Sequence, residues 1–269
     1  MPKVSISNSP HNPPTVWVGK RMVDRIAKHI RWMLRARFFG IPFFRRAWLK
    51  PSQHIVVDRH EMQLAYDARE EPNVRIVFFE NFIDDQYGLS EMKGTISTIA
   101  DIGANVGCFT LAAKSYFPAA TIHAYEPNPR ILNVLQQNVT RVGASIFPEA
   151  VGTVDGYVKI VDESFSGNAI TERAEASSHA IPQVCLEKVI QRLGGEVDLL
   201  KLDCEGAEWQ ILSDDHSLAK VKRMCLEYHL RGGRTFDQLA EVVARHKFEI
   251  IHHEPQGEVG VIWCDKRAS

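Results

Sequence analysis

Residues 98–107, which include Asp101–Gly107, have the pattern of a strand that runs through a glycine-bearing turn into a helix. Such a turn is typical of loops that bind a nucleotide cofactor. A dinucleotide-binding loop has a glycine where Asn105 stands, because the backbone there must approach a pyrophosphate. Gly103 and Gly107 flank Asn105, so the spacing indicates a nucleotide cofactor without a pyrophosphate.

Glu126 is a second candidate, since it follows Gly103 by 23 residues and ends the next apolar segment. A carboxylate at the end of a second strand can accept hydrogen bonds from both hydroxyls of a ribose. The same carboxylate would repel a 2′-phosphate, which disfavours NADP. The alternative is that Gly103 and Gly107 only allow tight packing of strand and helix, and that Glu126 is solvated.

Three carboxylates lie within six residues in the segment Asp203–Glu208. Asp203 follows an apolar stretch, and Glu205 and Glu208 are three residues apart, which places them on one face of a helical turn. Crowded carboxylates raise one another's pKa or require a cation. The cluster therefore predicts a general base, a divalent metal site or a site for the cationic part of a ligand. Alternatively, the two glutamates only favour the start of a helix.

His229 and Asp203 are the two candidates for a general base. His229 follows a predicted strand, and the ordinary pKa of histidine suits proton transfer near neutral pH. If Asp203 binds a divalent ion instead, the ion would lower the pKa of an acceptor hydroxyl and orient it. A lone histidine after a strand is more often structural, and His123 inside a strand is interpreted as a strand residue.

The elements that position these residues alternate between strand and helix from about residue 97 onward. This alternation predicts an α/β fold with a mainly parallel sheet covered by helices on both faces. Ligands of such sheets lie beyond the carboxyl ends of the strands, so the residues that end the strands should converge on one crevice. The predicted strands are 96–102, 121–125, 145–151, 198–202, 224–228, 248–252 and 260–264.

Helices are predicted at 108–116, 128–142, 186–193 and 235–246. We expect Asn128 to cap the second of them, with Pro129 at its first position and Gly143 after its end. Thr235 and Gln238 have the capping-box pattern that opens the last helix.

Between the third and fourth strands, the pair Asp155-Gly156 predicts a hairpin turn followed by a strand at 157–161. Residues 164–180 are rich in Ser and small polar side chains and predict a loop long enough to gate a substrate.

The segment 20–50 is the one asymmetric patch of charge, with ten Lys or Arg residues against one acid, Asp24. Apolar residues are interleaved with the basic ones, which predicts an amphipathic helix. Such a helix can lie on an anionic membrane surface or receive an acidic substrate. The simpler alternative is that its apolar stripe packs against the main domain. We expect residues 1–70 to form an N-terminal extension and residues 71–269 to form the main domain.

Whole-chain composition narrows the class of protein. The 269 residues are 45% hydrophobic, which suffices for one large core. The 32 basic and 33 acidic side chains nearly cancel, so no nucleic-acid partner is expected. The five cysteines include no C-x-x-C pair, and neither a signal-peptide-like start nor a run of about 18 apolar residues occurs. These features predict a cytoplasmic protein with reduced thiols.

Three motifs together resemble the FkbM family of S-adenosylmethionine-dependent methyltransferases. They are Asp101–Gly107, Tyr125-Glu-Pro-Asn-Pro129 and Lys201–Glu208. Upstream, the acidic-aromatic segment that ends in Tyr87 is similar to one that often precedes the family's first motif. The resemblance extends over about residues 79–230.

The resemblance implies a class I, Rossmann-like methyltransferase fold in a bacterial protein. It also implies methyl transfer to a hydroxyl of a sugar, glycolipid, polysaccharide or natural product. Glu126 would hold the ribose of the cofactor, Glu149 or Ala150 would lie at the adenine, and Asp203 would lie at the methyl-transfer end. The cofactor residues that the resemblance implies are Tyr87, Asp101, Gly103, Asn105, Gly107, Glu126, Pro127, Asn128, Glu149 and Ala150.

The charges of the candidate residues agree with this donor. A sulfonium cation suits a crevice lined by Asp101, Glu126 and Asp203 better than the anionic diphosphate of NAD does. Two other functions stay open at this point: an NAD-dependent oxidoreductase or epimerase, and a degenerate methyltransferase fold that serves as a binding module. A divalent metal is also an open alternative.

Overall fold

The computed structural model describes residues 15–42, 54–67, 73–161, 171–177 and 179–267. The helices are α1 (Thr15–Phe38), α2 (Val74–Phe79), α3 (Cys108–Tyr116), α4 (Leu132–Val139), α5 (Leu186–Arg192), α6 (Glu208–Ile211), α7 (Asp215–Leu218) and α8 (Phe236–Arg245). The strands are β1 (His54–Val57), β2 (His60–Gln63), β3 (Thr98–Ile102), β4 (Thr121–Tyr125), β5 (Ser145–Phe147), β6 (Ala150–Gly152), β7 (Gly156–Ile160), β8 (Thr171–Ala174), β9 (Ile181–Cys185), β10 (Val197–Leu202), β11 (Val221–His229), β12 (Phe248–Gln256) and β13 (Val259–Lys266).

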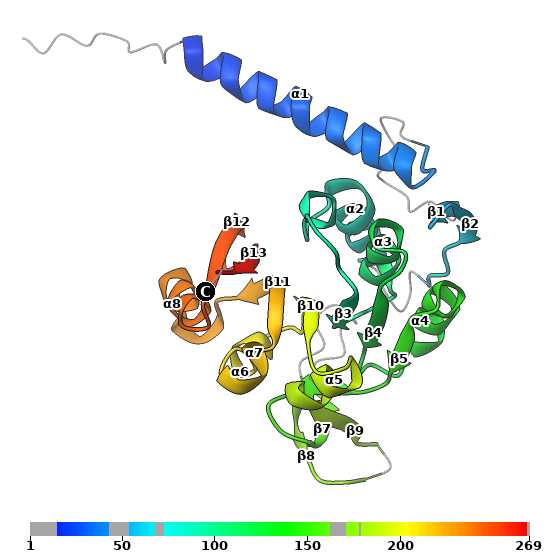
Figure 1. Ribbon diagram of the computed structural model, residues 1–269, viewed down its shortest axis with the longest axis vertical. Coiled ribbons are helices and arrows are strands. Elements are labelled where there is room, and N and C mark those ends of the chain that lie inside the picture. The colour runs from blue at the N-terminus through cyan, green and yellow to red at the C-terminus, as the bar shows by residue number, and fades with distance from the viewer. Residues whose placement is uncertain (1–14, 43–53, 68–72, 162–170, 178, 268–269) are drawn as a thin grey trace, which may run out of the picture.

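The central element of the fold is a seven-stranded sheet in the order β12-β13-β11-β10-β3-β4-β5 (Figure 1). Strands β11, β10, β3, β4 and β5 are parallel neighbours, and only β13 runs antiparallel to the strands on both of its sides. The chain proceeds from β3 through β4 to β5, and later fills the other side of β3 with β10 and β11. The order therefore reverses at β3, and ligands of open α/β sheets bind at such a switch point.

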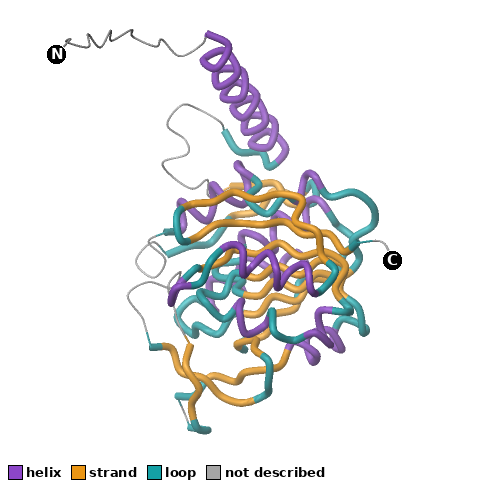
Figure 2. The backbone as a smooth tube through the Cα atoms, turned by 90° about the vertical axis from the view of Figure 1, so that its left-hand side faces the viewer, coloured by secondary structure: helices purple, strands orange, loops and turns teal. Residues whose placement is uncertain are grey.

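Alternate residues of each central strand point to opposite faces of the sheet and into different cores. Ile99, Leu199 and Cys225 pack in one cluster with α2 and α3. Their neighbours in sequence, such as Ala100 and Leu200, pack in a second cluster with α5, α7 and α8. Figure 2 shows helices on both sides of the layered strands. The predicted α/β sheet with helices on both faces is confirmed.

The smaller sheet, in the order β6-β9-β7-β8, differs from the prediction. A single strand was expected at 145–151, but β5 ends at Phe147 and β6 begins at Ala150 in the other sheet. The predicted strand after Asp155-Gly156 exists as β7, yet it pairs with β8 and β9 and not with β6. The expected loop 164–180 contains β8, while residues 162–170 and 178 lie outside the described residues. Sequence pattern alone could not assign these short strands to a sheet, because their partners are distant in the chain.

Most predicted helices are confirmed, but one predicted cap is wrong. Asn128 does not cap α4, which has Ile131 at its N-cap position and begins at Leu132. The Asn128 side chain instead accepts a hydrogen bond from the Arg130 backbone N–H at 3.1 Å, so it stabilises the turn before the helix. The capping box of Thr235 and Gln238 is confirmed at α8.

The predicted N-terminal helix is present as α1, which ends at Phe38 (Figure 1). Its last turns dock on the π-helical segment Glu80–Asp84, where the Trp32 Nε1–H donates to Asp84 at 2.6 Å. Phe39, just after the helix, is fully buried against Phe82 at 4.9 Å between ring centroids. Within the described ranges, no helix is long and apolar enough to span a bilayer.

Candidate active site

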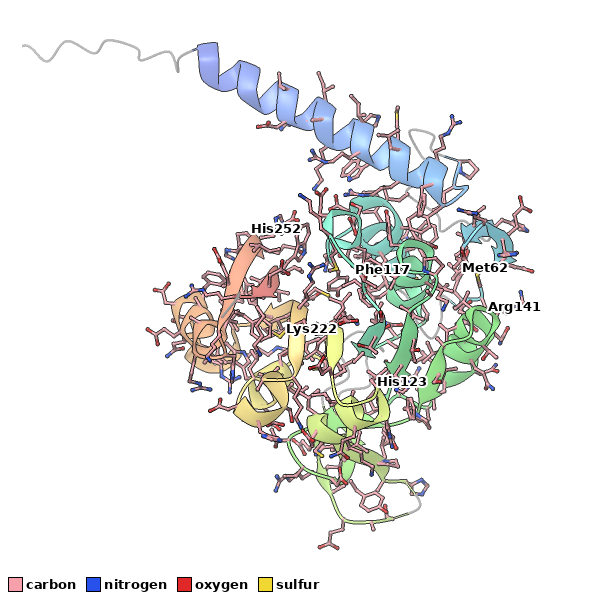
Figure 3. All side chains as sticks on the ribbon, in the orientation of Figure 1. Met62, Phe117, His123, Arg141, Lys222 and His252 are labelled. Atoms are coloured by element: carbon pink, nitrogen blue, oxygen red, sulfur yellow. The ribbon has the colours of Figure 1, made fainter. Side chains whose placement is uncertain are left out.

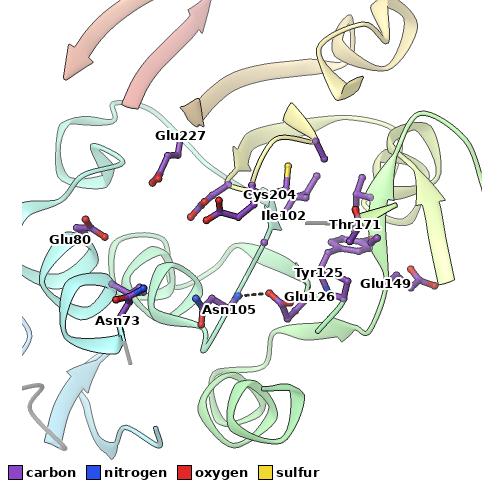
Figure 4. Close-up of a pocket in the computed structure, with 18 of the residues that line it drawn as sticks. Asn73, Glu80, Ile102, Asn105, Tyr125, Glu126, Glu149, Thr171, Cys204 and Glu227 are labelled. Carbon is purple, nitrogen blue, oxygen red and sulfur yellow. Dashed lines mark hydrogen bonds between the residues drawn. The ribbon is translucent and has the colours of Figure 1, made fainter. Parts of the chain in front are cut away.

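A cavity of about 260 Å³ lies at the carboxyl ends of β3, β4, β10 and β11 (Figure 4). Strands on both sides of the switch point deliver their terminal residues to it, as the parallel sheet requires. We call this cavity the cofactor pocket. The predicted residues that line it are Gly103, Asn105, Glu126, Pro127, Glu149, Ala150 and Asp203.

The other predicted site residues do not line the cofactor pocket: Tyr87, Asp101, Gly107, Asn128 and His229. Tyr87, Asn128 and His229 each contact a residue that does. Asp101 pairs with Lys201 beneath the pocket, and Gly107 packs against α4. The site therefore consists of a layer of lining residues and a buried layer beneath it.

The turn after β3 needs glycine for a steric reason. Gly103 has a φ of +78°, and a Cβ on it would lie 1.7 Å from the carbonyl oxygen of Asp203. The ends of β3 and β10 are thus in backbone contact across the floor of the pocket. Gly107 has a φ of +90°, and a Cβ there would lie 2.5 Å from Val139 on α4. Gly103 therefore sets the pocket floor, and Gly107 sets the packing of α3 on α4.

Glu126 is fixed by two backbone N–H groups. Its Oε2 accepts from Asn105 at 2.9 Å and its Oε1 accepts from Asn128 at 2.8 Å. Asn105 has a φ of +50°, which turns its N–H toward this carboxylate. Burial raises the pKa of Glu126 to about 7, although the two N–H bonds oppose the shift. Each carboxylate oxygen keeps a lone pair for a further donor.

A buried ammonium group, that of Lys201, lies beneath the pocket. Its Nζ is 3.2 Å from Asp101 Oδ1 and 3.5 Å from Asp203 Oδ2, and it donates to the Gly103 carbonyl. Burial alone would lower the Lys201 pKa, but the two carboxylates raise it, so the group stays charged. Asp203 also accepts a 2.8 Å hydrogen bond from the Tyr87 hydroxyl. Asp101 thus positions Lys201, and Lys201 and Tyr87 together position the Asp203 carboxylate.

Three glutamates crowd around Asp203 at one end of the pocket. Glu80 comes from the π-helical segment, Glu205 from the turn after β10, and Glu227 from β11. Burial, followed by the charge of Asp203, raises the pKa of Glu80 and of Glu205 to about 7. The same two causes raise the pKa of Glu227 further, and Glu227 accepts from the Gln86 side chain at 3.0 Å. We call this end the acidic end (Figure 4).

His229 lies behind the acidic end and lines an adjoining cavity of about 550 Å³. Its Nε2 is 3.3 Å from Glu205, and its Nδ1 is 3.5 Å from Glu208. Burial opposes the charged ring, but Glu208 and Glu205 outweigh it and raise the His229 pKa. The Glu208 carboxylate is fully buried and accepts from the backbone N–H groups of Cys204 and Gly206. Glu208 therefore stabilises the turn that carries Glu205.

The opposite end of the pocket contains Glu149, which has a dedicated cationic partner. Arg192 of α5 makes a two-pronged ion pair with its carboxylate, the longer bond being 3.1 Å. The guanidinium also lies over the Phe147 ring at 4.5 Å from the centroid. Tyr125 stacks on Phe147, so a planar aromatic layer backs this end. We call it the aromatic end.

Sequence reasoning missed four residues that the geometry makes important: Glu80, Lys201, Glu227 and Arg192. For Lys201 a signal existed, because a lone lysine interrupts the apolar strand Val197–Leu202. For Glu227 the signal was weaker, because it is one carboxylate near the end of the predicted strand 224–228. Glu80 opens the acidic-aromatic segment that ends in Tyr87, but that segment gave it no role of its own. Arg192 had no signal, because it pairs with Glu149 from α5, which lies far away in sequence.

The lining of the pocket fits S-adenosylmethionine. Among the described residues that line it there are six carboxylates and no lysine or arginine. Such a lining attracts a sulfonium cation and repels the diphosphate of NAD. The two remaining lone pairs of Glu126 suit a pair of ribose hydroxyls. No cluster of three or more His, Cys, Asp and Glu side chains in the described ranges has the arrangement of a metal site.

Comparison with known proteins gives a family match over residues 101–250, more than half of the chain, to the Methyltransferase FkbM domain. The AMB antimetabolite synthetase AmbE of Pseudomonas aeruginosa is 28% identical over 76% of this chain, which spans only 12% of the synthetase. Methyltransferase 1 of Beauveria bassiana is 29% identical, over 53% of this chain and 69% of its own. A solved structure, the Methanococcus jannaschii fibrillarin pre-rRNA processing protein, matches with a TM-score of 0.46, 11% identity and coverage of 80% and 83% of the two chains.

Proposed function

This chain belongs to the FkbM methyltransferase family and has the class I, Rossmann-like methyltransferase fold, and from that premise we propose that it is an S-adenosylmethionine-dependent O-methyltransferase. The acceptor that we propose is a hydroxyl of a sugar, glycolipid, polysaccharide or natural product. The observation that carries the choice of donor is the lining of the cofactor pocket, with its six carboxylates and no basic side chain among the described residues. The family match favours a methyltransferase over the NAD-dependent oxidoreductase or epimerase that the sequence left open.

The residues divide the work between the two ends of the pocket. Glu126 would accept the ribose hydroxyls, and Glu149 with Ala150 would contact the adenine. The acidic end would hold the cationic part of the donor, which supplies an activated methyl group. Holding the acceptor oxygen in line with that methyl group accounts for much of the rate of such a transfer.

Asp203 is the residue that we propose as the base for the acceptor hydroxyl. It lines the pocket with part of its carboxylate exposed, whereas His229 lines the adjoining cavity. Lys201 and the Tyr87 hydroxyl hold the Asp203 carboxylate from below and leave its outer face toward the pocket. An ionised carboxylate is an acceptor only, so it can orient a hydroxyl and take its proton as the methyl group arrives.

The test combines calorimetry with a methylation assay. Wild-type protein should bind S-adenosylhomocysteine and not NAD, and should transfer a labelled methyl group to a component of a bacterial polysaccharide or glycolipid extract. The Asp203→Asn variant should bind S-adenosylhomocysteine with an affinity within about threefold of wild type. Its turnover should be about 100-fold lower, which is the usual contribution of a positioned base. His229→Gln is the matched comparison, because it tests the other predicted base.

Different results contradict different parts of the proposal. If the protein binds NAD and does not bind S-adenosylhomocysteine, the assignment of S-adenosylmethionine as the donor is refuted. Unchanged turnover in Asp203→Asn with lost turnover in His229→Gln would transfer the role of base to His229. If the protein binds S-adenosylhomocysteine but methylates no component of any extract, O-methyl transfer is refuted and the binding-module function is favoured. If the label appears only on nitrogen, O-methyl transfer is refuted as well.

A further inference from the structure

The helix α1 carries an apolar stripe that nothing in the described part of the chain covers. The stripe consists of Val23, Ile26, Ile30, Met33 and Leu34, whose exposed fractions run from 46% to 65%. Their spacing of three, four and again three or four residues places them on one side of the helix. Figure 3 shows side chains on the side of α1 that is turned away from the rest of the protein, with no other element over them.

The opposite side of α1 is already used. Lys28 pairs with Asp84 at 3.1 Å, Trp32 contacts Phe79 at 5.1 Å between ring centroids, and Arg35 pairs with Asp85 at 3.2 Å. Residues 28, 32 and 35 follow each other at helical spacing and define the docked side. Because Ile30 and Trp32 are two residues apart, their side chains point in nearly opposite directions. The helix cannot bury its stripe on the body without breaking the docked contacts.

Charge indicates what could cover the stripe. Arg31 and Arg37 each lie three residues from Leu34, so they border the stripe, and both are exposed. Over its whole length α1 has seven basic residues and one acidic residue. A second copy of α1 would bring these like charges together, which disfavours pairing of two copies through the stripe. A surface that is apolar inside and anionic outside matches both features.

We propose that α1 is an interfacial helix that binds the surface of an anionic lipid bilayer through this stripe. Such binding needs a helix with apolar side chains on one side and basic side chains beside them, and α1 has both features. In the described residues no helix can cross a bilayer, so the contact would be peripheral. The inference does not depend on methyl transfer, because it concerns a surface outside the cofactor pocket.

Vesicle flotation of the full chain tests the proposal. Wild-type protein should float with vesicles of phosphatidylcholine and 30% phosphatidylserine, and much less with phosphatidylcholine alone or at 0.5 M NaCl, since salt screens surface charge. Ile30→Glu should lower the partition coefficient at least tenfold, since it places a carboxylate in the apolar contact. Arg31→Gln with Arg37→Gln should lower it about fivefold for each charge removed. Ile251→Glu, on β12, is the matched control, because Ile251 is 57% exposed and outside the stripe.

Thermal melting of each variant should match wild type, because the substituted side chains are exposed and unpacked. The proposal is overturned if wild type does not float, if Ile30→Glu floats as wild type does, or if Ile251→Glu loses as much as Ile30→Glu. It is also overturned if light scattering shows a dimer that Ile30→Glu dissociates, because the stripe would then bind a second copy. S-adenosylhomocysteine affinity should be unchanged in all variants, which separates this surface from the cofactor pocket.

Discussion

The two ends of the cofactor pocket differ in how their carboxylates are stabilised. At the aromatic end and at the ribose position each carboxylate has its own partner: Glu149 has Arg192, and Glu126 has two backbone N–H groups. At the acidic end Glu80 and Glu227 face one another's charge and that of Asp203. Asp203 there is paired with the buried Lys201, and Glu205 is paired with His229 and Arg231.

The difference indicates which part of the pocket is complete before a ligand arrives. Carboxylates with fixed partners keep their geometry, so they form a preorganised frame for a nucleoside. Carboxylates that raise one another's pKa await a cation that relieves the repulsion. Under the proposed function, recognition of the nucleoside would lie at one end of the pocket and sensitivity to charge at the other. Substitutions at each end, and a change of pH, distinguish the two.

Gly103→Ala should affect both ends, because Gly103 is where β3 touches the Asp203 backbone. A Cβ 1.7 Å from the Asp203 carbonyl oxygen forces the two strands apart, in addition to the strain of a φ of +78°. We expect a loss of about 4 kcal/mol in the free energy of unfolding. Thermal melting should show a decrease of roughly 12 °C in Tm for a chain of this size.

Gly143→Ala is the matched control for this variant, since Gly143 has a φ of +74° and open space around it. It should lose only about 1 kcal/mol, which is the backbone strain alone. Equal losses in the two variants would show that the contact with Asp203 is not what requires glycine.

Glu126→Gln should weaken ligand binding at the ribose position without abolishing it. The amide NH₂ would face a backbone N–H of Asn105 or Asn128, and one acceptor for the ribose would be lost. Hydrogen bonds to charged groups contribute about 2 kcal/mol, so S-adenosylhomocysteine should bind about 30-fold more weakly. Calorimetry at pH 8 is suitable, because the Glu126 pKa of about 7 makes it an anion there.

Glu187→Gln is the control for this binding experiment. Glu187 pairs with Lys220 at 2.7 Å on the surface and does not line the pocket. Its affinity should equal that of wild type. A loss in both variants, or in neither, would refute the assignment of the ribose to Glu126.

The acidic end should make the preference for the charged donor depend on pH. Glu80 and Glu205, with pKa values of about 7, are mostly neutral at pH 6 and mostly anionic at pH 8. Raising the pH should therefore strengthen binding of the sulfonium donor relative to its neutral product analogue. We expect the ratio of the two dissociation constants to change roughly tenfold.

Measuring both ligands on the same protein removes pH effects that they share, such as those of Glu126. Glu80→Gln should reduce the change, and Arg192→Gln should leave it intact. A ratio that stays constant between pH 6 and pH 8 would contradict the distinct role of the acidic end.

Arg192→Gln should give the smallest effect. The variant removes the ion pair with Glu149 and the contact over Phe147, both of which are partly exposed to solvent. Exposed pairs contribute about 0.5–1 kcal/mol, so affinity for S-adenosylhomocysteine should fall two- to fivefold. A loss as large as that of Glu126→Gln in the same titration would mean that the aromatic end dominates recognition.

Much of the fold was predictable because it depends on local pattern. The limits of α3 and β4 were correct to the residue, since glycine, proline and the apolar runs mark them. The division of 145–151 into β5 and β6 was not predictable, because only the partners of each strand separate them. The cap at Asn128 was mispredicted because its side chain bonds within the preceding turn.

The glycine-bearing turn at Gly103, the carboxylate of Glu126 after β4 and the acidic turn at Asp203 could all be predicted from the sequence, because strand, turn and residue type are contiguous there. The position of Lys201 beneath Asp101 and Asp203, and the approach of Glu80 and Glu227 to the acidic end, follow from tertiary packing. Tertiary packing also decided that α1 docks by its Trp32 side and leaves its apolar stripe outside. These outcomes depend on distances between residues far apart in the chain, which residue spacing does not encode.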